Sequence, residues 1–208
     1  PHAQRVLNTS MKAVGEVMSI GRNFKEAFQK GIRSMEISRF GFGCDGKDRL
    51  SDEELKRADK ELLQLIRDKI RIPNDERIFY IRYALKAGIS LDEICSLSNI
   101  DRWFIDNMRE LVEIEEEVIK YRNNKIDEEI KIPLELLKVA KLNGFSDRQL
   151  AFILNSKEAK VRDARKRQNV KAVYKLVDTC AGEVAAKQPY YYSTYETVDE
   201  SRQSKKKK

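Results

Sequence analysis

Apolar residues recur every three or four positions along most of the chain, which is the period of amphipathic helices rather than of strands. The stretch from Gly88 to Val118 shows this period clearly and predicts two helices joined by a tight turn. Gly88 suits the positive φ that ends one helix, and Ser90 with Glu93 three residues later forms a capping box for the next. We take this helical hairpin as the centre of the fold.

The second helix of the hairpin is capped by Asn99 or Asp101 and carries the only tryptophan, Trp103, in its first turn. Its apolar positions follow at helical spacing: Phe104, Met108, Leu111 and Val118. A side chain as large as that of Trp103 gains most from burial. We therefore predict that Trp103 and Phe104 are core anchors; the alternative use of Trp103 is as a platform for a ligand.

Further helices are predicted on both sides of the hairpin, because polar capping residues and Pro or Gly stops bound each apolar stripe. They cover about 24–35, 51–70, 75–87, 134–143, 146–153 and 155–168. From Val170 onward the period is lost, and Tyr190 to Tyr192 follow Pro189. The sequence thus predicts an all-α bundle of about seven or eight helices with an extended C-terminal arm.

One motif occurs twice. Gly-Ile-Ser at Gly88 and Gly-Phe-Ser at Gly144 stand 56 residues apart (144 minus 88), each followed by an apolar residue four positions after the serine. Two copies do not make a repeat array. They do suggest that the domain consists of two related helical units packed together.

Composition narrows the class of protein. With 208 residues and 41% hydrophobic residues the chain is long enough for a real core, and no apolar run is long enough to cross a bilayer. Pro1 to Ser10 lack the apolar segment of a signal peptide. The cysteines, Cys44, Cys95 and Cys180, form no close pair, which argues against a disulfide framework or a zinc site and favours a cytoplasmic protein.

Catalytic chemistry has few candidate residues. The single histidine, His2, stands at a chain end, and there is no nucleophile–base set and no P-loop. Glu113 and the run from Glu115 to Glu117 are spread around a helix, as a solvated face would be. Gly41 to Gly46 spells G-x-G-x-x-G, but a helix precedes it where a dinucleotide site needs a strand, so we predict a flexible loop. We expect no catalytic, cofactor-binding or metal-binding residue in this chain.

Several segments resemble the large subunit of carbamoyl phosphate synthetase. Met11-Lys-x-Val-Gly-Glu-Val-Met-x-Ile-Gly-Arg22 is similar to the end of the first ATP-grasp unit in that family. Five further segments of this chain resemble the central helical domain of that family. They are Asp75-Glu-Arg-Ile-Phe-Tyr-Ile81, Asn99-Ile-Asp-Arg-Trp-Phe104, Asn143-Gly-Phe-Ser-Asp147, Val173-Tyr-Lys-Leu-Val-Asp-Thr-Cys-Ala181 and Tyr192-Ser-Thr-Tyr-Glu196. The matches keep their order, and the chain departs from the common pattern over 40–73 and 121–133.

The resemblance implies a division of the chain into three parts: 1–37 as the end of the first ATP-grasp unit, 38–170 as an oligomerisation domain, and 171–208 as an arm and basic linker toward a second ATP-grasp unit. Such synthetases are ligases that make carbamoyl phosphate from bicarbonate, ammonia (usually from glutamine) and ATP, for arginine and pyrimidine biosynthesis. ATP and Mg²⁺ are then cofactors of the parent enzyme and not of this chain.

The partners implied by the resemblance are the other domains of the same subunit, a small glutaminase subunit and a second copy of the chain. In the predicted helix 51–70, Leu63 and Leu65 flank the inner apolar stripe on opposite sides. We predict that these two residues, Leu63 above all, meet the second copy; the alternative is a deeply buried helix. The resemblance also places Met11 to Gly15 beside the route of carbamate between two active sites, with ordinary packing as the alternative.

A nucleic-acid-binding protein of the helix-turn-helix type is the competing hypothesis. It rests on the two Gly-x-Ser hairpins, on a pI near 9.2 and on the basic residues Arg162, Arg165, Lys166 and Arg167. However, Lys205 to Lys208 supply four of the seven net positive charges, and the second helix of the first hairpin is acidic. We therefore expect neither a nucleic acid nor a membrane as partner.

Overall fold

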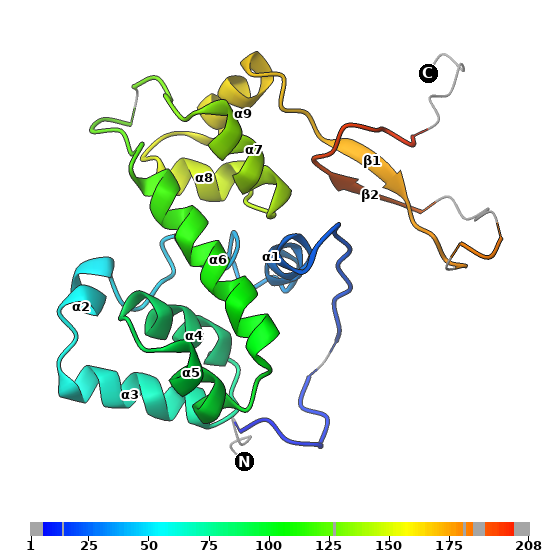
Figure 1. Cartoon of the computed structure of the whole chain (residues 1–208). Coiled ribbons are helices and arrows are strands. Elements are labelled where there is room, and N and C mark those ends of the chain that lie inside the picture. The colour runs from blue at the N-terminus through cyan, green and yellow to red at the C-terminus, as the bar shows by residue number, and fades with distance from the viewer. Residues whose placement is uncertain (1–5, 14, 127, 181, 185–189, 202–208) are drawn as a thin grey trace.

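The computed structural model describes residues 6–13, 15–126, 128–180, 182–184 and 190–201 (Figure 1). Within these ranges the chain forms a helical body and one small sheet at its C-terminal side. The elements are α1 (Phe24–Ser34), α2 (Asp52–Lys56), α3 (Lys60–Arg71), α4 (Arg77–Lys86), α5 (Leu91–Ser98), α6 (Arg102–Ile119), α7 (Leu134–Leu142), α8 (Asp147–Ile153), α9 (Glu158–Arg167), β1 (Val173–Leu176) and β2 (Tyr191–Thr194). The all-α prediction is confirmed, with one helix more than the upper estimate among the described residues.

The additional helix arises because the predicted helix 51–70 is two helices. Ser51 accepts a hydrogen bond from the amide of Glu54, and the Glu54 carboxylate accepts one in return, so the expected capping box starts α2. The carboxylate of Asp59 then accepts from the amide of Leu62 and starts α3. A second N-cap only eight residues after the first stops α2 after little more than one turn.

Helix α6 is the spine of the fold. It packs against α1, α4, α5, α7 and α8, and Figure 1 shows it running between the group α2 to α5 and the group α7 to α9. Its inner face buries Ile105, Met108, Leu111, Val112 and Val118. Helix α4 lies deepest, with six consecutive buried residues from Phe79 to Ala84.

The two Gly-x-Ser motifs have the same structure. Gly88 and Gly144 both have positive φ, 79° and 86°. The amide of the residue after each glycine donates to a carbonyl of the preceding helix at 3.0 Å, as in a Schellman motif. Ser90 and Ser146 then cap α5 and α8. The predicted relation between the two hairpins therefore extends to their hydrogen bonds.

The same relation corrects one predicted helix start. Asn99 and Asn155, again 56 residues apart (155 minus 99), both adopt left-handed backbone with φ of 53° and 49°. Each ends a helix instead of starting one, as Asn can because its short side chain tolerates this conformation. Asp101 is the N-cap of α6, and Lys157, not Asn155, is the N-cap of α9.

The C-terminal arm is a two-stranded antiparallel hairpin in which Val173 faces Thr194. It is fastened to α1: the Thr194 hydroxyl donates to the buried Glu26 carboxylate at 3.1 Å, and Lys30 donates to the carbonyl of Ser193 at 2.5 Å. These two bonds tie the hairpin to the first helix of the chain.

Candidate functional site

The predicted association surface lies on α3. This helix packs on α4 and α5 through Ile66 and Ile70, both fully buried. Leu65 is 45% exposed, whereas Leu63 is half-buried and packs against the core. Of the two predicted contact residues, Leu65 is the one that reaches the surface.

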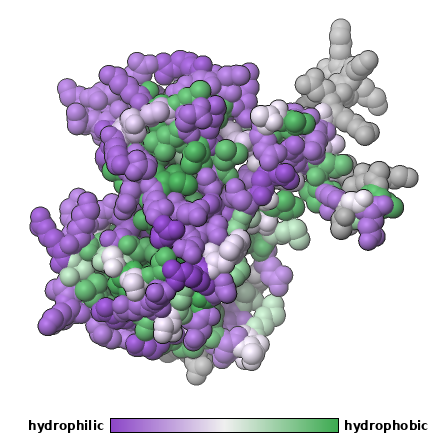
Figure 2. Space-filling view, in the orientation of Figure 1, coloured by the Kyte–Doolittle hydropathy of each residue, from purple (hydrophilic) through white to green (hydrophobic). Residues whose placement is uncertain are grey.

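Leu65 belongs to a shallow apolar hollow of about 270 Å³, which we call the α3 hollow. Its apolar wall consists of Leu65, Ile72 and Val6, all at least 45% exposed. Val6 comes from the N-terminal segment, whose Leu7 amide donates to the carbonyl of Pro73. On the face shown in Figure 2, apolar side chains come in patches separated by polar ones.

The prediction that Trp103 and Phe104 are core anchors is wrong. Trp103 is 55% and Phe104 40% exposed, while Ile105 is fully buried. Successive helical residues are about 100° apart, and the inner face of α6 runs through Ile105 and Met108, so its first turn carries both aromatic rings outward. They pack edge-on against Phe24 of α1 with ring centroids 5.3 Å away.

The acidic face predicted on α6 is also partly wrong, because Glu115 is only 3% exposed. It accepts from Arg82 at 2.6 Å and from Lys86 at 2.6 Å, both on α4. Burial alone would raise the pKa of Glu115, but the charges of Arg82 and Lys86 hold it below its usual value. A carboxylate saturated by two cations is a structural link between α4 and α6 and not an acid or base for catalysis.

The sequence carried one signal for this ion cluster. Arg82 and Lys86 are four residues apart on a helix whose other positions are almost all apolar, so at least one charge had to enter the core. The sequence alone did not identify Glu115 as the partner.

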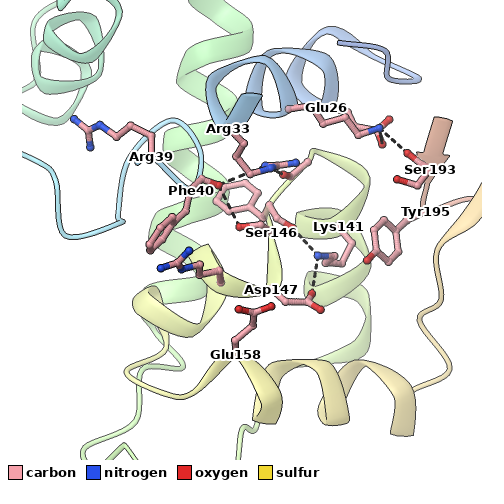
Figure 3. A pocket seen from close by; sticks show the side chains of 14 residues that line it. Glu26, Arg33, Arg39, Phe40, Lys141, Ser146, Asp147, Glu158, Ser193 and Tyr195 are labelled. Carbon is pink, nitrogen blue, oxygen red and sulfur yellow. Dashed lines mark hydrogen bonds and ion pairs between the residues drawn. The ribbon is translucent and has the colours of Figure 1, made fainter. Parts of the chain in front are cut away.

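A second polar cluster surrounds a cavity of about 550 Å³ (Figure 3). Lys141, 3% exposed, donates to the carbonyl of Phe145 and to the carboxylate of Asp147, both at 2.7 Å. Burial lowers the pKa of Lys141 to about 8, although the charge of Asp147 opposes the shift. Arg165 binds the same carboxylate at 3.0 Å. The sequence pattern alone indicates no role for Lys141.

The G-x-G-x-x-G segment is a loop, as predicted, and no strand precedes it among the described residues. The sequence predicted a flexible loop, but two of its side chains are buried in the fold: Phe42 is 3% and Asp45 4% exposed. A Cβ on Gly43, whose φ is 150°, would stand 2.3 Å from the Arg82 side chain. Close packing, not phosphate binding, accounts for that glycine.

The remaining predicted residues are brought into no cluster. Met11 is 82% exposed, and a Cβ on Gly15 would meet no atom within 4 Å, so the described N-terminal segment stands clear of the helical body there. His2 and Lys205 to Lys208 lie outside the described residues. In the part of the chain that the structure describes, the three cysteines are free and no group of three or more His, Cys, Asp or Glu side chains gathers to hold a metal ion.

Most of the basic residues that the nucleic-acid hypothesis assigned to α9 pair with neighbouring carboxylates. Arg162 pairs with Glu158 at 2.9 Å, and Arg167 pairs with Glu129. With Arg165 held by Asp147, three of the four basic residues proposed to contact phosphate are already paired, and Lys166 is the exposed cation that remains among these four. Among the described helices, none is long and apolar enough to cross a membrane.

Comparison with known proteins gives one consistent result. The family described as carbamoyl-phosphate synthetase large chain, oligomerisation domain, matches residues 16–169. The carbamoyl phosphate synthase large chain of Archaeoglobus fulgidus is 50% identical over 208 residues, which is 100% of this chain and 18% of the relative.

Two further relatives agree. The carbamoyl phosphate synthase large chain, N-terminal section, of Methanopyrus kandleri is 47% identical over 94% of this chain and 34% of its own length. The arginine-specific, chloroplastic large chain of Arabidopsis thaliana is 40% identical over all of this chain and 16% of its own length. The chain thus spans about a sixth to a third of the curated relatives that it matches.

Proposed function

This chain belongs to the family of carbamoyl-phosphate synthetase large chains and contains its oligomerisation domain, and from that premise we propose that it is the assembly module of a longer enzyme. It joins two copies of the subunit and separates the units that flank it. The DNA-binding alternative has no support in the charges of α9 or in the comparisons.

The observation that carries the proposal is the exposure of Leu65 on α3. The helix already buries Ile66 and Ile70 against its own domain, whereas Leu65, beside the α3 hollow, leaves 45% of its surface in contact with water. Burial against the equivalent face of a second copy would remove Leu65 and Ile72 from water, at about 25 cal/mol per Å² of apolar surface. Leu63 lies on the opposite flank of the inner stripe, where it is half-buried against the core.

The experiment is light-scattering mass after size exclusion over a wide concentration range. We expect a concentration-dependent dimer for the unchanged chain and for the control Val139→Glu, which places the same charge on a residue 40% exposed on α7. Leu65→Glu is expected to be monomeric. Leu63→Glu should also weaken the dimer, with some loss of stability because Leu63 touches the core.

A monomer at every concentration would contradict self-association through this chain alone. A dimer that persists in both Leu65→Glu and Leu63→Glu would place the interface elsewhere. Circular dichroism of each variant separates a lost interface from a lost fold.

The chemistry of the longer enzyme is part of the proposal. We assign to it the ATP- and Mg²⁺-dependent ligation of bicarbonate and ammonia to carbamoyl phosphate, with a small glutaminase subunit as a partner, in the cytoplasm, for arginine and pyrimidine biosynthesis. The described residues offer no converging catalytic set, and we therefore place the catalytic groups in the units outside this chain. The division at residues 37/38 and 170/171 remains a prediction.

The exposed segment around Met11 and Gly15 fits a surface that another unit covers, and we keep it as a candidate wall for carbamate transfer. In the longer enzyme, Gly15→Trp would then slow carbamoyl phosphate formation more than it slows ATP hydrolysis at the first site. Equal slowing of both would contradict a role in transfer.

A further inference from the structure

The cavity of about 550 Å³ is open to solvent and is bordered by α1, the loop at Phe40, the turn between α7 and α8, and the chain after β2 (Figure 3). Arg33 enters it from α1 and is half-buried; its Nη1 donates to the carbonyl of Gly144 at 2.7 Å and reaches that of Phe40 at 3.5 Å. Arg148, from α8, places its guanidinium 3.9 Å from the centre of the Phe40 ring. Phe40 thus contacts two arginines of the cavity that are 115 residues apart in the sequence (148 minus 33).

The carboxylates that line this cavity are already paired. Glu26 binds Lys30 at 3.0 Å. Asp147 binds Lys141 at 2.7 Å and Arg165 at 3.0 Å. The third, Glu158, binds Arg162 at 2.9 Å.

Among the described residues, neither Arg33 nor Arg148 has a carboxylate within ion-pair distance. Arg39, which also lines the cavity, is held by Asp45 at 2.7 Å. Two positive charges without an ion-pair partner therefore face the same space, and that of Arg33 is partly withdrawn from water. Burial lowers the pKa of Arg33 even though Glu26 lies near enough to oppose the shift. Such a group is stabilised by an anion that replaces its lost hydration.

We propose that this cavity binds an oxyanion of the phosphate or carboxylate class between Arg33 and Arg148. Only the Nη1 of Arg33 is used by the protein's own carbonyls, so its remaining N–H groups are available in the planar fork that matches two oxygens of such an anion. The neighbouring ammonium of Lys141 adds positive charge at neutral pH. The volume is in the range of small-molecule sites, about 300–1,000 Å³, so the oxyanion would be one group of a larger ligand.

The test is a titration of the whole chain with inorganic phosphate and, separately, with acetate, at constant ionic strength maintained by NaCl and followed by the NMR signals of arginine Nε–H groups. We expect saturable shifts at Arg33 and Arg148. Stronger binding of phosphate than of acetate would indicate a phosphate-bearing ligand, and the reverse order a carboxylate.

Arg148→Gln is the main variant, because Arg148 is exposed and we expect its substitution to leave the fold intact, which circular dichroism checks. We expect it to weaken binding about tenfold; Arg33→Gln should do so at least as strongly. The matched control is Arg102→Gln, whose arginine is exposed, already paired with Asp92 and absent from the cavity lining.

Absence of saturable binding, or equal binding by the unchanged chain and both cavity variants, would overturn the proposal. Because the assembly experiment concerns α3, either result leaves the proposed function to be judged on its own measurement.

Discussion

Arg82 on α4 donates through its Nη2 to both carboxylate oxygens of Glu115 on α6, at 2.6 and 2.8 Å, inside the core. Their side chains are 1% and 4% exposed. Lys86, one turn after Arg82, donates to the same carboxylate at 2.6 Å and to Asp52 of α2. Glu115 therefore binds two cations where three helices meet, and Asp48 and Asp52 supply further negative charge to Arg82 and Lys86.

Glu115→Gln is expected to lower the free energy of unfolding by about 3–5 kcal/mol, because it leaves Arg82 without its main counter-charge in the core. Arg82→Met should cost less, since Glu115 keeps Lys86. Urea denaturation measures both. The control is Glu113→Gln on the same helix, whose exposed pair with Arg109 is worth less than about 1 kcal/mol. Equal losses for the buried and the exposed glutamate would refute this account.

The outward position of Trp103 leads to a second prediction. Trp103→Ala should lower the free energy of unfolding by less than Ile105→Ala, although tryptophan is the larger residue, because only Ile105 is buried in the core. We expect about 2–5 kcal/mol for Ile105→Ala. Thermal denaturation of both variants, with acrylamide quenching of the Trp103 fluorescence, provides the test. Weak quenching in the unchanged chain would mean that the indole is covered.

The helix caps were predictable from the sequence, whereas the burial of Glu115 and the exposure of Trp103 were not. Gly88, Ser90 and their equivalents Gly144 and Ser146 act locally, through backbone conformation and a hydrogen bond three residues away, and local pattern was sufficient for them. Which face of α6 points inward was settled by packing against α1 and α4, which no local pattern contains.

The candidate sites show the same difference between what local sequence determines and what tertiary packing determines. Leu65 was predicted to flank the inner stripe because helix geometry alone places it there, and it is exposed. By contrast, Arg33 and Arg148 are 115 residues apart (148 minus 33), and only the tertiary fold brings both to Phe40. Sequence spacing gave no sign of that cavity.

Gly43 provides a test of the buried loop. A Cβ there would stand 2.3 Å from Arg82, at a φ of 150° that side chains rarely adopt, so Gly43→Ala must displace the guanidinium that binds Glu115. We expect a loss of about 1–3 kcal/mol in the free energy of unfolding. Gly15→Ala is the matched control, because a Cβ at Gly15 meets no atom within 4 Å. If both substitutions have the same small effect in urea denaturation, the loop is not held by Arg82.

Lys141 makes stability depend on pH. Its pKa is lowered to about 8 in the folded chain, below the ordinary value of 10.5. Between these values the unfolded chain binds more protons than the folded one, so this group's contribution to stability rises with pH through that window. Relative to Lys141→Met, the unchanged chain should gain about 2 kcal/mol in the free energy of unfolding between pH 7 and pH 9.5.

The comparison with Lys141→Met removes the titration of tyrosines and cysteines, which both chains share, and Asp147 keeps Arg165 as a partner in the variant. Urea denaturation at four or five pH values is the measurement. A difference between the two chains that stays constant with pH would show that Lys141 has an ordinary pKa and that its ammonium is better solvated than its 3% exposure indicates. A difference that falls with pH would mean that Asp147 stabilises the charged form more than burial opposes it, which would reverse the sign of the shift.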